Sequence, residues 1–148
     1  MNVQFDRAVA GGIVGTAVMT AVGLWGAPMM GIPAMNPAMN PATMLAGAMG
    51  GSLVLGWLGH FMIGTILALA YAMVQSRLPG PPAIRGALYS LAPFLMAQLL
   101  VMPMMGMPVF SGSAAMAMGS LVGHLVYGAV LGAVYGMRSA PRAAGAAA

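Results

Sequence analysis

The chain of 148 residues is 61% hydrophobic and 4% charged, and its formal net charge is +4. A composition this apolar is not that of an ordinary soluble domain, so we expect an integral membrane protein. The absence of cysteine excludes disulfides and thiolate metal sites, and the single acidic residue, Asp6, leaves no carboxylate pair for acid–base catalysis. The arginines are spread along the chain rather than clustered beside aromatic residues, so no nucleic-acid partner is indicated.

Four long uncharged stretches predict an all-α integral membrane fold with four transmembrane helices. The helices are expected over 8–31, 52–74, 86–105 and 114–137. At a rise of ~1.5 Å per residue, each is long enough to cross a hydrocarbon core of ~30 Å.

Local signals add detail to this expectation. Asn40 is a good N-cap and Pro41 suits a first helical turn, so a short interfacial helix is predicted over 41–49. In the third transmembrane helix, Pro93 predicts a kink. The amide of Gln98 needs polar partners within the membrane and is expected to face another helix rather than lipid.

One stretch of the sequence occurs twice. Residues 59–73 read GHFMIGTILALAYAM and residues 123–137 read GHLVYGAVLGAVYGM, and they contain the two histidines of the protein, His60 and His124. In both stretches Gly, Leu and Tyr follow the histidine after four, seven and eleven residues. At ~100° per residue these positions share one face of a helix, so each histidine heads a similar stripe.

A second match lies upstream, where residues 28–33 read PMMGIP and residues 103–108 read PMMGMP. The loop around 36–49 accounts for extra residues in the first half. The chain is therefore predicted to be a tandem repeat of two-helix hairpins. The predicted boundaries are a single domain over 1–148, repeat one over 8–76, repeat two over 84–138 and a flexible tail over 139–148.

The basic residues predict the orientation. All of them lie near the amino end, in the connector between helices two and three, or in the tail: Arg7, Arg77, Arg85, Arg138 and Arg142. By the positive-inside rule, both termini and the connector are cytoplasmic. Two hairpins of one orientation make the repeat a parallel one, with a pseudo-two-fold axis along the membrane normal.

The segments LPGPPAIRGALY, VMPMMGMPVFS and SLVGHLVYGAVLGAVYG together resemble the DUF6789 family, a group of small bacterial and archaeal membrane proteins of unknown function. The resemblance covers nearly all of 8–137. It implies a four-helix membrane fold and a location in a bacterial or archaeal inner membrane. It supplies no activity, substrate or catalytic residue.

The repeated stripes supply the candidate cofactor-binding residues His60, His124, Gly64 and Gly128. In a bundle of sequential neighbours, helices two and four are diagonal, about 14 Å apart for adjacent axes ~10 Å apart, which suits a haem b held by both histidines. The other hypotheses are a different small ligand or ion, and an interhelical hydrogen bond without a ligand. The glycines leave room for a flat cofactor or permit close helix packing.

Methionine accounts for 18 residues, and Met35, Met39 and Met44 lie in the first loop. Thioethers are soft ligands that select Cu(I), so these three residues are candidate metal ligands. The alternative is that methionine fills apolar gaps in a bundle rich in glycine and alanine.

We therefore expect a non-catalytic membrane subunit, an accessory component of a larger membrane complex of the respiratory type. Its partners would be the lipid bilayer and other membrane protein subunits. The alternative function is a small ligand- or ion-handling membrane protein, which binds haem b between the histidines or Cu(I) through the Met-rich loop.

The orientation is testable with reporter fusions. Fusions near Pro81 and at the carboxyl end should report a cytoplasmic location, and fusions near Asn40 and Ser111 should not, because every arginine lies on the first side. A cytoplasmic signal from Asn40 would contradict the four-helix topology.

Overall fold

The computed structural model describes residues 3–29, 31 and 40–137. In this part of the chain, four helices are long and apolar enough to cross a membrane, as predicted: Phe5–Gly26, Leu53–Arg77, Pro82–Met104 and Ala114–Gly136. The third begins four residues earlier than expected. Pro82 lies in its first turn, where the missing N–H of proline has no helical partner to lose.

The spanning helices consist of shorter elements. The first contains α1 (Phe5–Ala21) and the π-helical turn η1 (Val22–Gly26), and α2 (Ala27–Met29) follows it directly. The second contains α4 (Leu53–Val74) and the 3₁₀ turn η3 (Gln75–Arg77). The third contains α5 (Pro82–Met96), the π-helical turn η4 (Ala97–Val101) and α6 (Met102–Met104), and the fourth is α7 (Ala114–Gly136). The succession of a π-helical turn and a short α-helix thus occurs in both the first and the third helix. In each case it coincides with the start of a Pro-Met-Met-Gly segment.

Small residues allow the helices to approach one another closely. A Cβ atom at Gly64 of α4 would collide with Thr16 of α1, and one at Gly128 of α7 would collide with Gly86 of α5. α1 packs against both α4 and α7, and α5 packs along α7, whereas α4 and α5 make few direct contacts. An apolar side chain gains little free energy by moving from lipid into the protein interior. Membrane helices are therefore held together by close packing of this kind.

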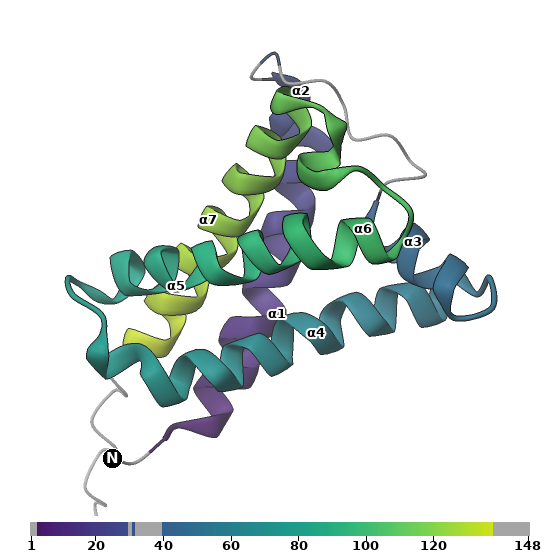
Figure 1. Ribbon diagram of the computed structural model, residues 1–148. Helices are drawn as coiled ribbons and strands as arrows, with labels where there is room; N and C mark the ends of the chain where they lie inside the picture. The colour runs from purple at the N-terminus through teal and green to yellow at the C-terminus, as the bar shows by residue number, and fades with distance from the viewer. Residues whose placement is uncertain (1–2, 30, 32–39, 138–148) are drawn as a thin grey trace, which may run out of the picture.

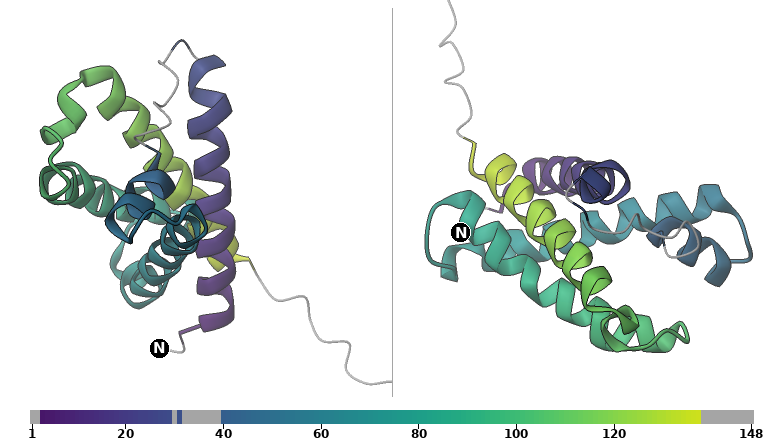
Figure 2. Two further views of the ribbon diagram at one scale, coloured as in Figure 1. Left: turned by 90° about the vertical axis from the view of Figure 1, so that its right-hand side faces the viewer. Right: turned by 90° about the horizontal axis from the view of Figure 1, so that it is seen from above.

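The four helices converge at one end and diverge at the other (Figure 1), and Figure 2 shows the same arrangement from two further sides. The converging end contains the amino end of α1, the α4–α5 connector and the carboxyl end of α7. Tyr71 is only 1% exposed there, and its ring centroid lies 5.7 Å from that of Tyr135. These tyrosines are core residues, although their sequence position near the membrane boundary is typical of interfacial anchors.

At the diverging end, α3 (Pro41–Ala48) packs against the first turns of α4. The Asn40 side chain accepts a hydrogen bond from the Ala42 N–H at 2.9 Å, which confirms the predicted N-cap. Gly56 of α4 faces the Ala42 carbonyl so closely that a side chain would not fit. The 3₁₀ turn η5 (Val109–Gly112) lies in the connection between α6 and α7. The predicted flexible tail over 139–148 lies outside the described residues.

Close packing at Gly128 is testable through stability. Gly128→Ala places a Cβ atom against the Gly86 backbone and should destabilise the protein by about 1–3 kcal/mol through overpacking. Gly59→Ala is the matched control, because its Cβ would meet the Met49 sulfur at an ordinary 3.4 Å. Thermal unfolding in detergent, followed by circular dichroism, measures both. Equal unfolding temperatures for the two variants would contradict the packing account.

Candidate functional site

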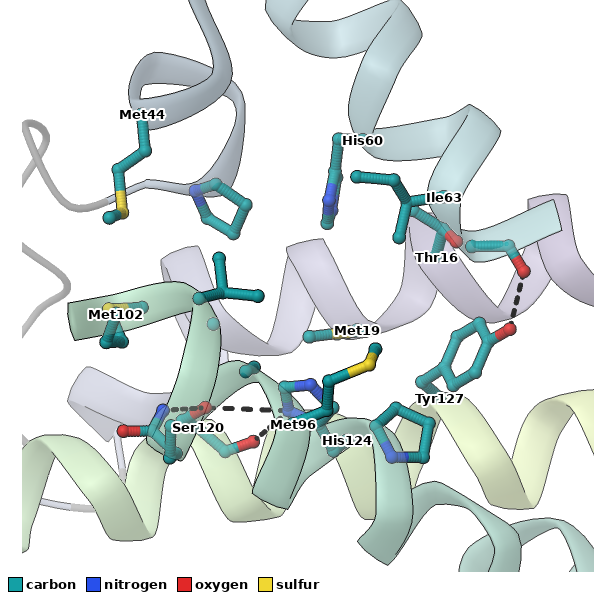
Figure 3. A pocket seen from close by; sticks show the side chains of 18 of the residues that line it. Thr16, Met19, Met44, His60, Ile63, Met96, Met102, Ser120, His124 and Tyr127 are labelled. Atoms are coloured by element: carbon teal, nitrogen blue, oxygen red, sulfur yellow. Dashed lines mark hydrogen bonds between the residues drawn. The ribbon is translucent and has the colours of Figure 1, made fainter. Parts of the chain in front are cut away.

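The diverging helices enclose a cavity of about 250 Å³, shown from close by in Figure 3. All four spanning helices and α3 contribute to its walls, which are largely apolar. Six methionines line it: Met19, Met44, Met96, Met102, Met105 and Met116. Because methionine is flexible and polarisable, such walls adapt to the shape of an occupant.

The structure brings both histidines to this cavity. His60 extends into it from α4 and His124 from α7, on the opposite wall (Figure 3). The two candidate glycines differ. Gly64 lines the cavity but packs against Thr16, and Gly128 lies at the contact with α5 rather than at the cavity. Both positions serve helix packing, and neither opens a flat space for a cofactor.

The hydrogen bond of His124 identifies its free nitrogen. Nδ1 lies 2.8 Å from the carbonyl oxygen of Ser120, one helical turn earlier. A carbonyl oxygen only accepts, so Nδ1 carries the proton and donates it. An ionised ring is costly in hydrocarbon, and the neutral ring therefore has a lone pair on Nε2. No hydrogen bond to that nitrogen is made within the described part of the chain.

His60 presents the opposite nitrogen. The Thr20 hydroxyl donates its one proton to the Thr16 carbonyl at 2.8 Å, so its contact of 3.2 Å with His60 Nε2 is one in which it accepts. Because the carbonyl contact is the shorter of the two, we assign the ring proton to Nε2 and the lone pair to Nδ1. Among the described residues this nitrogen also has no hydrogen-bond partner. Each ring thus has its N–H satisfied by the protein and one lone pair unused.

A polar network covers one wall. Gln98, which is fully buried, donates from Nε2 to the Ser120 hydroxyl at 3.0 Å, and its Oε1 accepts from the Ser111 hydroxyl at 3.2 Å. Gln98 therefore faces another helix, as expected. Phe110 and Ser111 both have positive φ, of 52° and 57°, a conformation that costs non-glycine residues ~1–2 kcal/mol each. The bond to Gln98 is one of the contacts that hold this strained turn in place.

Two features distinguish opposite sides of the cavity. On one side, the Tyr127 hydroxyl donates to the Gly64 carbonyl at 2.6 Å and so links α7 to α4. On another, Ile63 of α4 and Met96 of α5 line the cavity and are 41% and 44% exposed. Because α4 and α5 make few contacts with each other, we place the mouth of the cavity between them.

Several site residues are not singled out by sequence reasoning. Ser120 carries a usable signal, because it precedes His124 by four residues and thus lies on the same helix face. Thr20, Ser111 and Tyr127 carry none, since their partners come from other helices or depend on an unusual turn. Of the three candidate copper ligands, Met44 lines the cavity, and Met35 and Met39 lie outside the described residues.

Comparison with known proteins gives a family but no activity. No curated protein and no solved structure matches the chain. A family model described as a family of unknown function, DUF6789, matches residues 3–144. The chain therefore belongs to the DUF6789 family, as its motifs predicted.

Proposed function

We propose that this protein is a non-catalytic membrane protein that binds a small, lipid-soluble ligand in the cavity between its diverging helices. The observation that supports this most directly is the pair of histidines, which line the same largely apolar cavity and each keep one ring nitrogen without a hydrogen-bond partner among the described residues. Polar atoms without partners are costly in an apolar interior, and a ligand that completes their hydrogen bonds accounts for their presence.

The position of the mouth supports entry from the membrane. Ile63 and Met96 lie on spanning helices and are partly exposed, so an opening beside them would face the hydrocarbon of the bilayer. A ligand that passes between α4 and α5 comes from the lipid phase without crossing water. This route suits molecules that are already dissolved in the bilayer.

The size of the cavity limits the ligand. A volume of about 250 Å³ exceeds the ~150 Å³ of an engineered apolar cavity that binds benzene, and lies below the ~300–1,000 Å³ typical of pockets for drug-sized molecules. One substituted ring fits inside. A longer tail would extend through the mouth into the bilayer.

The two cofactors considered from the sequence receive unequal support. Haem b, a macrocycle of four pyrrole rings, is larger than this cavity, whose walls also include the side chains of Met19 and Met96. Cu(I) is better supported, because Met44 and other thioethers line the same cavity as two imidazoles. Copper is therefore the alternative ligand that the test below has to distinguish.

An accessory role in a larger respiratory-type complex is the second candidate function. The sparse contact between α4 and α5 favours it, since a partner helix would cover the exposed apolar side chains beside this seam, such as Ile66 and Leu91. Persistent co-purification with a large complex in mild detergent supports this role. A free protein under those conditions would contradict it.

We also propose that the chain is a parallel tandem repeat in a bacterial or archaeal inner membrane, with cytoplasmic termini. The paired elements η1–α2 and η4–α6 support the repeat, because the same irregular turn precedes the same motif twice. The orientation is supported by Arg7, which donates to the Met137 carbonyl at the carboxyl end of α7, and by the α4–α5 connector, which lies at the same end (Figure 1).

Photolabelling tests the binding site. A lipid-soluble aryl diazirine, activated in liposomes that contain the protein, should label Met19 and Met102, which line the cavity, in addition to Met62 on the outer surface of α4. Gly123→Leu should remove the cavity labels and spare Met62, because a side chain at this position extends toward Met19 into the cavity.

Gly47→Leu provides the control, since no atom lies within 4 Å of a Cβ at this position. It should leave all labels unchanged. Labelling confined to Met62 in the wild-type protein would contradict a lipid-accessible cavity. Bound copper, measured by elemental analysis, together with absent cavity labelling would favour the metal hypothesis.

A further inference from the structure

We propose that the cavity selects ligands that donate hydrogen bonds, and that its ligand is a lipid-soluble phenol of the quinol type rather than the corresponding quinone. This inference rests on the proposed function. It depends on which partner of each hydrogen bond is the donor and carries the proton. For His124 the carbonyl partner fixes the proton on Nδ1, and for His60 we assign it to Nε2 from the shorter contact of Thr20 with the Thr16 carbonyl.

The wall at His60 offers only acceptors. The neighbouring hydroxyls donate their hydrogen bonds to backbone carbonyls and so offer no free donor. Thr16 donates to the Gly12 carbonyl at 2.7 Å, and Tyr127 donates to the Gly64 carbonyl at 2.6 Å. The His60 N–H is held by Thr20, which leaves the Nδ1 lone pair. A ligand carbonyl placed here would face that lone pair without a donor between them.

The wall at His124 contains an acceptor and a donor. Nε2 of His124 is the acceptor, because Nδ1–H is held by the Ser120 carbonyl. The Ser120 hydroxyl is a donor whose proton the network leaves unused. A ligand hydroxyl can both donate and accept, so it suits this wall better than a carbonyl does.

A quinol matches both walls at once. It carries two hydroxyl groups on opposite edges of a single ring, and the two lone pairs lie on opposite walls of a cavity that holds one substituted ring. Its apolar tail would leave through the mouth at Ile63 and Met96. Oxidation to the quinone replaces both donors by acceptors, and a site built around a hydroxyl rejects such an analogue.

Thr20 is a positioning residue in this account. Its hydroxyl fixes the proton of His60 on Nε2. Without that acceptor, the imidazole is free to move its proton to Nδ1 and to offer an N–H to the cavity. Thr20→Val should therefore relax the preference for the hydroxyl. Thr65→Val is the matched control, because Thr65 also donates to the carbonyl one turn earlier, Phe61, but makes no hydrogen bond with either histidine.

The test uses the diazirine assay on the full chain in liposomes under nitrogen, with 2-decyl-1,4-hydroquinone and 2-decyl-1,4-benzoquinone as competitors. The chain contains neither cysteine nor lysine, so side-chain thiols and amines that would react with the quinone are absent. The hydroquinone should protect Met19 and Met102 at a concentration at least about tenfold lower than the quinone, since the quinone leaves a buried polar group unpaired. This ratio should fall severalfold in Thr20→Val and stay unchanged in Thr65→Val.

Equal protection by the two competitors, or an unchanged ratio in Thr20→Val, would overturn the inference. If the cavity is labelled but neither competitor protects it, the quinol-type ligand is excluded and the proposed lipid-soluble binding site stands. If the cavity is not labelled in the absence of competitor, the proposed function itself fails.

Discussion

The close approach of backbones at small residues is the constraint on which this structure depends. In a membrane, lipid tails solvate apolar side chains as well as a neighbouring helix does, so helices gain from packing only where their backbones meet. The contacts at Gly64 with Thr16 and at Gly86 with Gly128 provide such meetings. They explain why many large apolar side chains of this protein are exposed and why its core consists mainly of glycine, alanine and tyrosine, with Leu131 and Phe94 among the few larger apolar residues.

The cavity follows from where these contacts stop. Close packing joins α1 to α4 and α5 to α7 toward the converging end, and beyond it the helices separate (Figure 1). The space between them contains two histidines and is too large to be filled by one side chain. α3 and η5 lie beside the diverging ends, and flexible methionines line what remains. The helices are thus closely packed at one end, and at the other end they enclose a cavity large enough for a small ligand.

The sequence allows much of this fold to be predicted. Hydropathy locates all four spanning helices, and the Asn40–Pro41 pair predicts α3. The repeated stripe directs attention to His60 and His124, and the structure places both of them in the lining of one cavity. The roles of the glycines could not be assigned, since a glycine that makes room for a ligand and one that makes room for a helix have the same pattern.

The protonation pattern of the site could not be predicted either. It depends on Thr20, which lies on a different helix from His60, and on a carbonyl that becomes an acceptor only in the folded helix of His124. Ser111 reaches Gln98 only because two consecutive non-glycine residues have positive φ. Such contacts between distant segments leave no periodic trace in a single sequence.

Nitrogen-15 NMR of the imidazole rings in the full-length protein tests the central claim most directly, because protonated and bare ring nitrogens have well-separated chemical shifts. We predict two different neutral tautomers at neutral pH, with the proton on Nδ1 in His124 and on Nε2 in His60. The spectra of His60→Gln and His124→Gln would assign the signals. The same tautomer in both rings, or a doubly protonated ring, would contradict a cavity that presents two free lone pairs to its ligand.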